Sequence, residues 1–185
     1  MKQKLALAAD SDWKDMQSSE FRGSPFVRIG RDWMLITAGD IKNDKGNWNT
    51  MTASWGGLGV LWGMDVAFIF VRPVRHTFGF LNDASLFSLS FFDESFRPAL
   101  DMCGKKSGAD TDKASEAGLS PIFFSGNKID GAVGFKEASE IIFCRKIFTQ
   151  DFDPAGFTDA SIEKHYPKKD YHRVYIGEIT GIKIR

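Results

Sequence analysis

A cluster of basic and hydroxyl side chains, in the sequence VRPVRHT, follows a short apolar segment in the first half of the chain. The apolar segment, residues 65–70, is typical of a buried strand, and Arg72, Arg75 and Thr77 come directly after it. Pro73 favours a turn into a short helix. Free N–H groups at a helix start attract anions, and guanidinium groups match phosphate oxygens. The segment therefore predicts a phosphate site; the alternative is a set of solvated surface side chains.

The loop sequence KKSG at 105–108 is a second candidate. Lysine, serine and glycine in a loop can surround a phosphate with side-chain and backbone donors. Lys106 and Ser107 would be the binding residues, and the alternative is a mobile, solvated loop. Asp112 and Lys113, a few residues further on, are expected to decorate the surface of a helix.

The segment NTMTASW, residues 49–55, combines three hydroxyl side chains with a methionine and a tryptophan. Alternation along a strand puts Thr50, Thr52 and Ser54 on one side. Such a strand offers hydrogen bonds to a planar ring. An ordinary half-buried strand is the alternative.

Other catalytic patterns do not occur in the sequence. GGLGVLWG nearly matches a dinucleotide fingerprint, but Trp62 stands where the third glycine is required. The three histidines have no metal-type spacing, so no metal is expected. The two cysteines form no CxxC and are expected to be buried thiols. No GxSxG is present either.

The composition fits a single domain. The chain has 185 residues, with 24 Lys+Arg and 24 Asp+Glu, and this neutral balance argues against a general nucleic-acid binder. The 17 phenylalanines and five tryptophans can build a dense core or line a flat pocket. The apolar run near the N terminus ends at Asp10, too short for a signal peptide, and no run approaches the ~18 residues of a membrane span. We expect a cytoplasmic protein that binds neither nucleic acid nor membrane.

The elements that must position these residues are mostly strands. Strands are expected at 33–39, 47–55, 65–72, 85–92, 121–125, 140–149 and 172–185. Short helices are expected at 11–20, 74–83, 93–104 and after the loop at 105–108. A turn is expected at Asn43, Asp44 and Gly46, and a glycine-rich connection at 56–64.

The final segment alternates well. Val174, Ile176, Thr180, Ile182 and Ile184 are expected to share one face. Because the strands do not alternate with long helices, the pattern predicts a mainly β fold with short helices, arranged as a mostly antiparallel barrel.

Four segments, in this order, resemble the flavin reductase-like family with the FMN-binding split barrel, especially its flavoredoxin-like members. They are NTMTASWGG (49–57), VRPVRHT (71–77), CGKKSGADTDKASEAGL (103–119) and HRVYIGEI (172–179). The resemblance runs from about Phe26 to the C terminus. We therefore expect one domain over 1–185, with an N-terminal extension at 1–25 and an insertion at 151–170. The resemblance implies a Greek-key split β-barrel that forms a homodimer, with FMN near the subunit interface.

The resemblance also implies which residues hold the cofactor. Those implied along the isoalloxazine ring are Thr50, Met51, Thr52, Ala53 and Trp55. Those implied at the ribityl phosphate are Arg72, Pro73, Arg75, Thr77, Lys106 and Ser107. His172 is implied near the flavin face; the alternative is a surface histidine that opens the last strand. The insertion, longer than a barrel turn, would cover the partner subunit's pocket or shape the substrate entrance.

A bound flavin would carry the redox chemistry, so no nucleophile and base are needed from the protein. The resemblance implies an FMN-dependent reductase that takes hydride from NADH or NADPH and passes electrons to a small-molecule or protein acceptor. Because the sequence has no NAD(P)H motif, a non-enzymatic FMN electron carrier reduced by a protein partner is the alternative. A barrel that binds another phosphate-bearing ligand, such as pyridoxal phosphate or haem, is a third interpretation.

Overall fold

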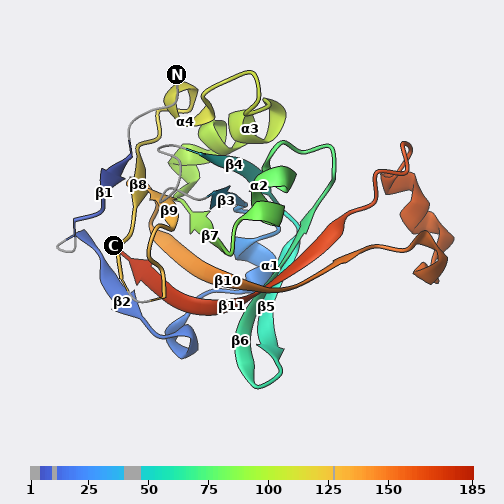
Figure 1. Ribbon diagram of the computed structural model, residues 1–185, viewed down its shortest axis with the longest axis horizontal. Helices are drawn as coiled ribbons and strands as arrows, with labels where there is room; N and C mark the ends of the chain where they lie inside the picture. Colours follow the sequence, from blue (N-terminus) through green and yellow to red (C-terminus); the bar gives the residue numbers. More distant parts are fainter. Residues whose placement is uncertain (1–4, 10–11, 40–46, 127) are drawn as a thin grey trace.

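The computed structural model describes residues 5–9, 12–39, 47–126 and 128–185. Its main feature is one curved, antiparallel, eight-stranded sheet (Figure 1). The strand order is β4 (Trp48–Ala53), β3 (Met34–Gly39), β7 (Leu86–Phe91), β10 (Glu140–Asp151), β11 (Arg173–Ile184), β6 (Met64–Val71) and β5 (Gly56–Leu61), with β2 (Lys14–Met16) paired to the end of β11. The hairpin expected between β3 and β4 is confirmed, although its turn at Asn43, Asp44 and Gly46 lies outside the described residues.

Strands β3, β4 and β7 and the first half of β10 are buried on both faces of the sheet. Successive side chains of a strand point to opposite faces, so Met34 and Ile36 pack in one apolar cluster while Leu35 packs in another. The second cluster lies beneath helices and a small additional sheet. These elements are α3 (Arg97–Lys105), α4 (Lys113–Glu116), β1 (Ala6–Leu7), β8 (Pro121–Phe123) and β9 (Val133–Phe135). Burial on both faces explains why the strands read as continuous apolar runs.

Most of the expected elements are confirmed. The helices expected at 74–83 and 93–104 correspond to α2 (Thr77–Asp83) and α3, and α4 follows the polar loop. The helix expected at 11–20 is wrong, because β2 pairs there with β11 and only a 3-10 turn, Ser18–Glu20, follows. None of the helices in the described part of the chain is long and apolar enough to cross a membrane.

The glycine-rich segment at 56–64 is also not a connection, because it contains strand β5. A Cβ on Gly56 would lie 2.8 Å from the carbonyl oxygen of Phe68 on β6. Only glycine allows so close an approach between these strands. Gly56, one of the glycines that made the segment look like a loop, is therefore what lets β5 approach β6 so closely.

The last strand does not keep one face throughout. Its pairing with β10 shifts register between Phe143 and Cys144, whose partners are Gly181 and Ile179, so Thr180 is the extra residue of a β-bulge. A bulge of one residue exchanges the two faces. Tyr175 before the bulge and Ile182 after it consequently belong to the same apolar cluster, and the expected common face from Val174 to Ile184 is wrong.

β10 and β11 continue beyond the barrel as a two-stranded ribbon that carries the insertion (Figure 1). The end of the ribbon is fixed by an ion pair between Arg173 Nε and Asp151 Oδ1 at 2.7 Å. Beyond it the chain forms two 3-10 segments, Pro154–Gly156 and Ala160–His165, and returns to β11. The insertion predicted at 151–170 is thus an irregular segment held on an extended hairpin.

Candidate functional site

The three segments singled out in the sequence meet at the side chain of Asn49. Its Nδ2 donates a hydrogen bond to Thr77 Oγ1 at 2.7 Å, which joins the start of β4 to the start of α2. A Cβ on Gly108 would lie only 1.9 Å from Asn49 Oδ1, so the KKSG loop packs directly on the same amide. Asn49 therefore fixes all three segments against one another.

Arg75 links the VRPVRHT segment to the end of α3. Its Nη1 donates to the carbonyl oxygen of Gly104 at 2.9 Å. Gly104 also packs against β4, since a Cβ at this position would lie 3.3 Å from Thr52 Cβ. Thr52 Oγ1 in turn donates to the carbonyl oxygen of Leu100 in α3. These contacts hold α3 along β4.

Lys113 is buried, with 6% of its surface exposed, and does not decorate the surface as expected. Its ammonium group donates to the carbonyl oxygens of Thr50 and Cys103, each at 2.9 Å. Burial lowers the Lys113 pKa to about 8, because the charged form loses hydration. A buried cation thus connects the centre of β4 to α3.

A cavity of about 180 Å³ lies beside the end of β4. The residues that line it are Met51, Thr52, Ala53, Ser54, Trp55, Phe70, Arg72, Arg75 and His172. Seven of these residues are among the predicted site residues; Ser54 and Phe70 are additional. Ligand pockets usually measure at least ~300 Å³, so a ligand the size of a flavin nucleotide would also cover surface outside this cavity.

The other predicted residues lie near the cavity but do not line it. The Thr50 hydroxyl is buried and donates to the carbonyl oxygen of Ile36 at 3.1 Å. Thr77 is also buried, where its hydroxyl accepts from Asn49. Lys106 forms an ion pair with Glu116. Ser107 Oγ and Pro73 also lie outside the cavity lining, and Ser107 Oγ accepts from a backbone N–H two residues on, at 3.2 Å.

Arg72 has partners in the insertion, 98 positions away. Its guanidinium forms an ion pair with Asp170 at 3.0 Å and donates to the carbonyl oxygen of His165 at 2.7 Å. It also lies 5.2 Å from the centre of the Tyr166 ring. These hydrogen bonds lower the pKa of Asp170, because Arg72 stabilises the carboxylate. The insertion therefore packs over the cavity of its own chain.

His172 is buried and lines the same cavity, next to the strand end that carries Arg72. Its Nδ1 lies 2.8 Å from the Tyr166 hydroxyl, and its ring lies 5.1 Å from the Trp55 ring. Burial, and then the charge of Arg72, lowers the His172 pKa to about 4. The imidazole is therefore neutral near pH 7. Tyr166 and Asp170 were not predicted as site residues, because only the folded insertion brings them here.

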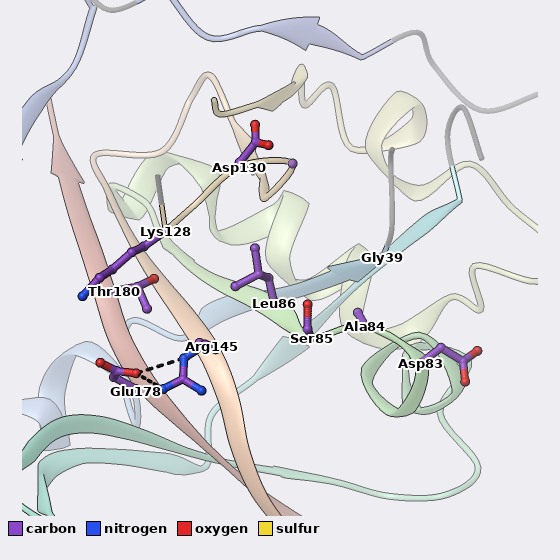
Figure 2. A pocket seen from close by; sticks show the side chains of 11 residues that line it. Gly39, Asp83, Ala84, Ser85, Leu86, Lys128, Asp130, Arg145, Glu178 and Thr180 are labelled. Atoms are coloured by element: carbon purple, nitrogen blue, oxygen red, sulfur yellow. Dashed lines mark hydrogen bonds and ion pairs between the residues drawn. The ribbon is translucent and has the colours of Figure 1, made fainter. Parts of the chain in front are cut away.

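A separate cavity of about 560 Å³ lies across β7, β10 and β11 (Figure 2). Arg145 and Glu178 face each other on its wall, with Nε and Oε2 3.0 Å apart. Asp83, Lys128 and Asp130 add two negative charges and one positive charge. Because no predicted site residue lines this cavity, it is not the candidate site.

The donor set beside β4 suits a ligand that has both an anionic group and a ring. Arg72 and Arg75 offer guanidinium groups, which match phosphate oxygens in geometry and charge. Trp55 and Phe70 offer aromatic surface for a ring. The residues present therefore fit FMN.

Comparison with solved structures identifies the fold. The chain is similar to the FMN-binding domain of a flavin reductases-like enzyme from Shewanella baltica OS155, with a TM-score of 0.64 and 14% identity over 93% of this chain and 76% of that one. It is similar to a flavoredoxin from Methanosarcina acetivorans, with a TM-score of 0.61 and 21% identity over 83% and 68% of the two chains. It is also similar to an NADH:FAD oxidoreductase from Streptomyces globisporus, with a TM-score of 0.60 and 15% identity over 83% and 74%.

No family model and no curated protein matches the sequence. At these identities the structural matches define the architecture, which is that of the FMN-binding split barrels. The fold class predicted from the sequence is confirmed, as is the resemblance of this chain to flavin reductase-like proteins and flavoredoxins.

Lys113 gives a direct test of how the site is supported. We predict that Lys113→Met lowers the free energy of unfolding at pH 7 by about 1–3 kcal/mol, since two buried carbonyl groups lose their donor. Lys105→Met is the matched control, because Lys105 is exposed and, among the described residues, forms its ion pair with Asp101 on the preceding turn. Chemical denaturation followed by circular dichroism measures both values.

The pH dependence of the free energy of unfolding should also distinguish the wild type from Lys113→Met. Between pH 8 and 10.5 native Lys113 loses its proton while the unfolded chain keeps it. Wild-type stability should then rise with pH relative to Lys113→Met, by up to about 3 kcal/mol. Identical pH profiles for the wild type and Lys113→Met would contradict this placement of the charge.

Proposed function

We propose that this protein is an FMN-binding oxidoreductase that takes hydride from NADH or NADPH and passes electrons to an acceptor. The observation that supports this proposal best is the pairing of two guanidinium groups with aromatic surface at the end of β4, in an FMN-binding split-barrel fold. Bound FMN supplies the redox chemistry, while the protein supplies binding and orientation.

Each side chain of the cavity then has a role. Arg75 binds the phosphate with charge-assisted hydrogen bonds, and Arg72 does the same once it releases Asp170. The outer side of Met51 to Trp55 supports the ring. Lys106 and Ser107 extend the phosphate site from the neighbouring loop. Neutral His172, oriented by Tyr166 at Nδ1, presents its other nitrogen to a bound ligand.

A flavoprotein that only carries electrons is the second candidate function. It is supported by the similarity to a flavoredoxin and by the insertion, whose contacts with Arg72 and Trp55 place it beside the cavity. Such a protein would bind FMN but receive its electrons from a protein partner.

Anaerobic addition of NADH or NADPH to the FMN-loaded protein separates the two functions. We predict that the flavin absorbance near its visible maximum bleaches with at least one nicotinamide. If FMN stays oxidised with both but is reduced by dithionite, the carrier is correct. A protein that remains colourless after incubation with FMN would contradict both functions.

We also propose that the protein forms a homodimer. Val60 and Trp62, at the tip of the hairpin of β5 and β6, are 72% and 62% exposed. Trp62 contacts the half-exposed Phe148 ring at 6.2 Å, so the hairpin and β10 present one apolar surface. A second copy of the chain would cover it. Sedimentation equilibrium should give a dimer for the wild type and a monomer for Trp62→Asp; an unchanged mass for the variant would contradict this surface.

Arg72 and Asp170 together test the phosphate assignment. We predict that Arg72→Ala weakens FMN binding by about 1.5–3 kcal/mol, because a charge-assisted hydrogen bond is lost. Asp170→Asn should tighten binding, since it releases Arg72 from a competing carboxylate. Titration of flavin fluorescence measures both affinities.

Asp170→Asn is also the matched control for Arg72→Ala, because both substitutions break the ion pair between Arg72 and the insertion. Arg22→Ala, an exposed arginine that does not line the cavity, should leave the affinity unchanged. Equal affinity for the wild type and Arg72→Ala would show that Arg72 does not touch the phosphate.

A further inference from the structure

A groove of about 600 Å³ adjoins the candidate site. It shares Ser54, Trp55 and Phe70 with the smaller cavity, so the two spaces meet at the corner between β4 and β5. Its remaining lining residues are Pro25, Phe26, Ile29, Gly30, Gly56, Gly57, Leu58, Phe152 and Tyr166. This volume is in the range of pockets that hold small organic ligands.

The lining of the groove differs in charge from that of the neighbouring cavity. Among the described residues, none that lines the groove carries a charge, whereas Arg72 and Arg75 line the cavity. Five of the lining side chains are aromatic, and Phe26 and Trp55 are 88% and 44% exposed. An anion placed in such surroundings would lose hydration without gaining a partner. A cation would gain only the aromatic faces, and Arg72, which already lies over the Tyr166 ring, repels it. The groove therefore selects against charged ligands and offers flat surface to a ring.

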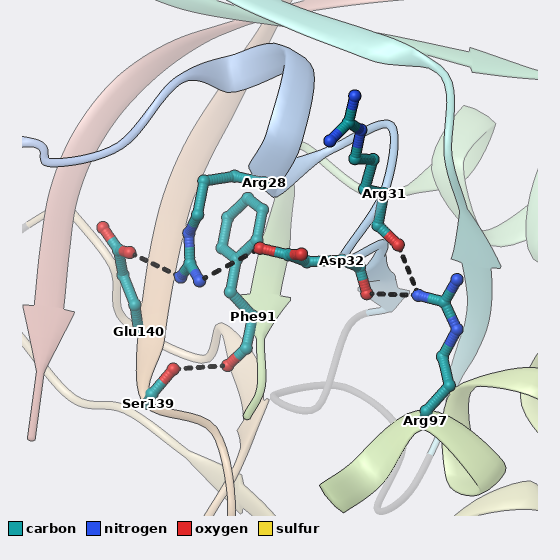
Figure 3. A network of polar contacts seen from close by, with 7 residues as sticks. All are labelled: Arg28, Arg31, Asp32, Phe91, Arg97, Ser139 and Glu140. Atoms are coloured by element: carbon teal, nitrogen blue, oxygen red, sulfur yellow. Dashed lines mark hydrogen bonds and ion pairs between the residues drawn. The ribbon is translucent and has the colours of Figure 1, made fainter. Parts of the chain in front are cut away.

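One wall of the groove is fixed by the helix α1 (Pro25–Arg28) and the residues after it (Figure 3). Arg28 does not line the groove, and its guanidinium pairs with Glu140 at 3.0 Å. Arg97 donates to the carbonyl oxygen of Asp32 at 3.1 Å and covers the ring of Trp33. These contacts hold the segment that carries Phe26, so this wall is already formed.

The opposite wall belongs to the insertion. The Tyr166 ring stacks on Phe157, with centroids 5.9 Å apart and an angle of 12° between the planes. Its hydroxyl contacts His172, and Arg72 lies over its face. Phe152 contacts Phe70 at 5.6 Å. The insertion is therefore packed in place as the second wall.

We propose that this groove binds an uncharged, planar ring compound beside the flavin site. The role of this compound as the electron acceptor rests on the proposed function, whereas its binding to the groove does not. A quinone is the acceptor class that fits best: it takes up two electrons and two protons to become a hydroquinone. NADH or NADPH supplies the hydride, and solvent supplies the second proton. A dinucleotide does not suit the groove, since nothing there pairs with its pyrophosphate.

Isothermal titration calorimetry with three ring probes of equal size tests the proposal. The probes are 2-naphthol, which is neutral at pH 7, 2-naphthoate, which is an anion, and N-methylquinolinium, which is a cation. We predict that 2-naphthol binds at least about tenfold more tightly than either ion, because the anion loses hydration unpaired and the cation is repelled by Arg72 beside Tyr166. Equal affinities, or preference for an ion, would overturn the proposal.

Variants of Phe26 locate the binding. Because this side chain is 88% exposed, Phe26→Asp should fold normally, yet it places a charge in the groove and should weaken 2-naphthol binding by about tenfold. Phe26→Leu should retain most of the affinity. Leu7→Asp is the control, since Leu7 is 56% exposed on β1 and lines neither the groove nor the cavity. Equal losses in Phe26→Asp and Leu7→Asp would overturn the proposal.

Two further measurements identify other occupants of the groove. Saturation with FMN should leave 2-naphthol binding intact; displacement would assign the groove to the flavin and overturn the proposal.

Sedimentation equilibrium should give the same mass for Phe26→Asp as for the wild type. Loss of the dimer in Phe26→Asp with unchanged 2-naphthol affinity would assign the groove to a second copy. If FMN fails to bind while 2-naphthol still does, the proposed function is wrong and the groove proposal stands.

Discussion

The hydrogen bonds from the Lys113 ammonium to two backbone carbonyls are the contact on which the site depends. They join Thr50, in the middle of β4, to Cys103, near the end of α3. The next residue after Cys103 is Gly104, whose carbonyl oxygen accepts from Arg75. Strand, helix and arginine are therefore positioned through one buried cation. Burying an ammonium group without a carboxylate is unfavourable, and the lowered Lys113 pKa is the physical sign of this.

Of the two arginines that line the cavity, one is paired with a carboxylate that a bound phosphate could replace. Arg75 is tied to the backbone of α3, whereas Arg72 is paired with Asp170 of the insertion. A phosphate that binds Arg72 must therefore compete with a carboxylate of the same chain. Among the described residues, those that line the neighbouring groove carry no such charge. The two spaces thus differ in the ligand chemistry they accept, although they share a wall.

The strand pattern predicted a mainly β, mostly antiparallel barrel, and the resemblance to flavin reductase-like proteins implied the split-barrel type. The segments around Thr52, Arg75 and Gly108 were each ambiguous alone, but the fold brings them together through Asn49. The errors have local physical causes. Glycine usually weakens a strand, yet Gly56 is what allows β5 to approach β6. A bulge at Thr180 reverses the faces of β11, and alternation alone does not reveal a bulge.

Other parts of the site depend on contacts between distant residues, and no local pattern predicts them. Lysine is seldom buried, so Lys113 was expected on the surface. Asp170 and Tyr166 reach Arg72 only because the insertion between β10 and β11 folds against it. Equilibrium dialysis of the protein with FMN and, separately, with riboflavin tests the central claim, that two arginines hold a phosphate beside a ring. The account predicts one FMN per chain and, because riboflavin lacks the phosphate, riboflavin binding at least about tenfold weaker. Equal binding of the two flavins would contradict it.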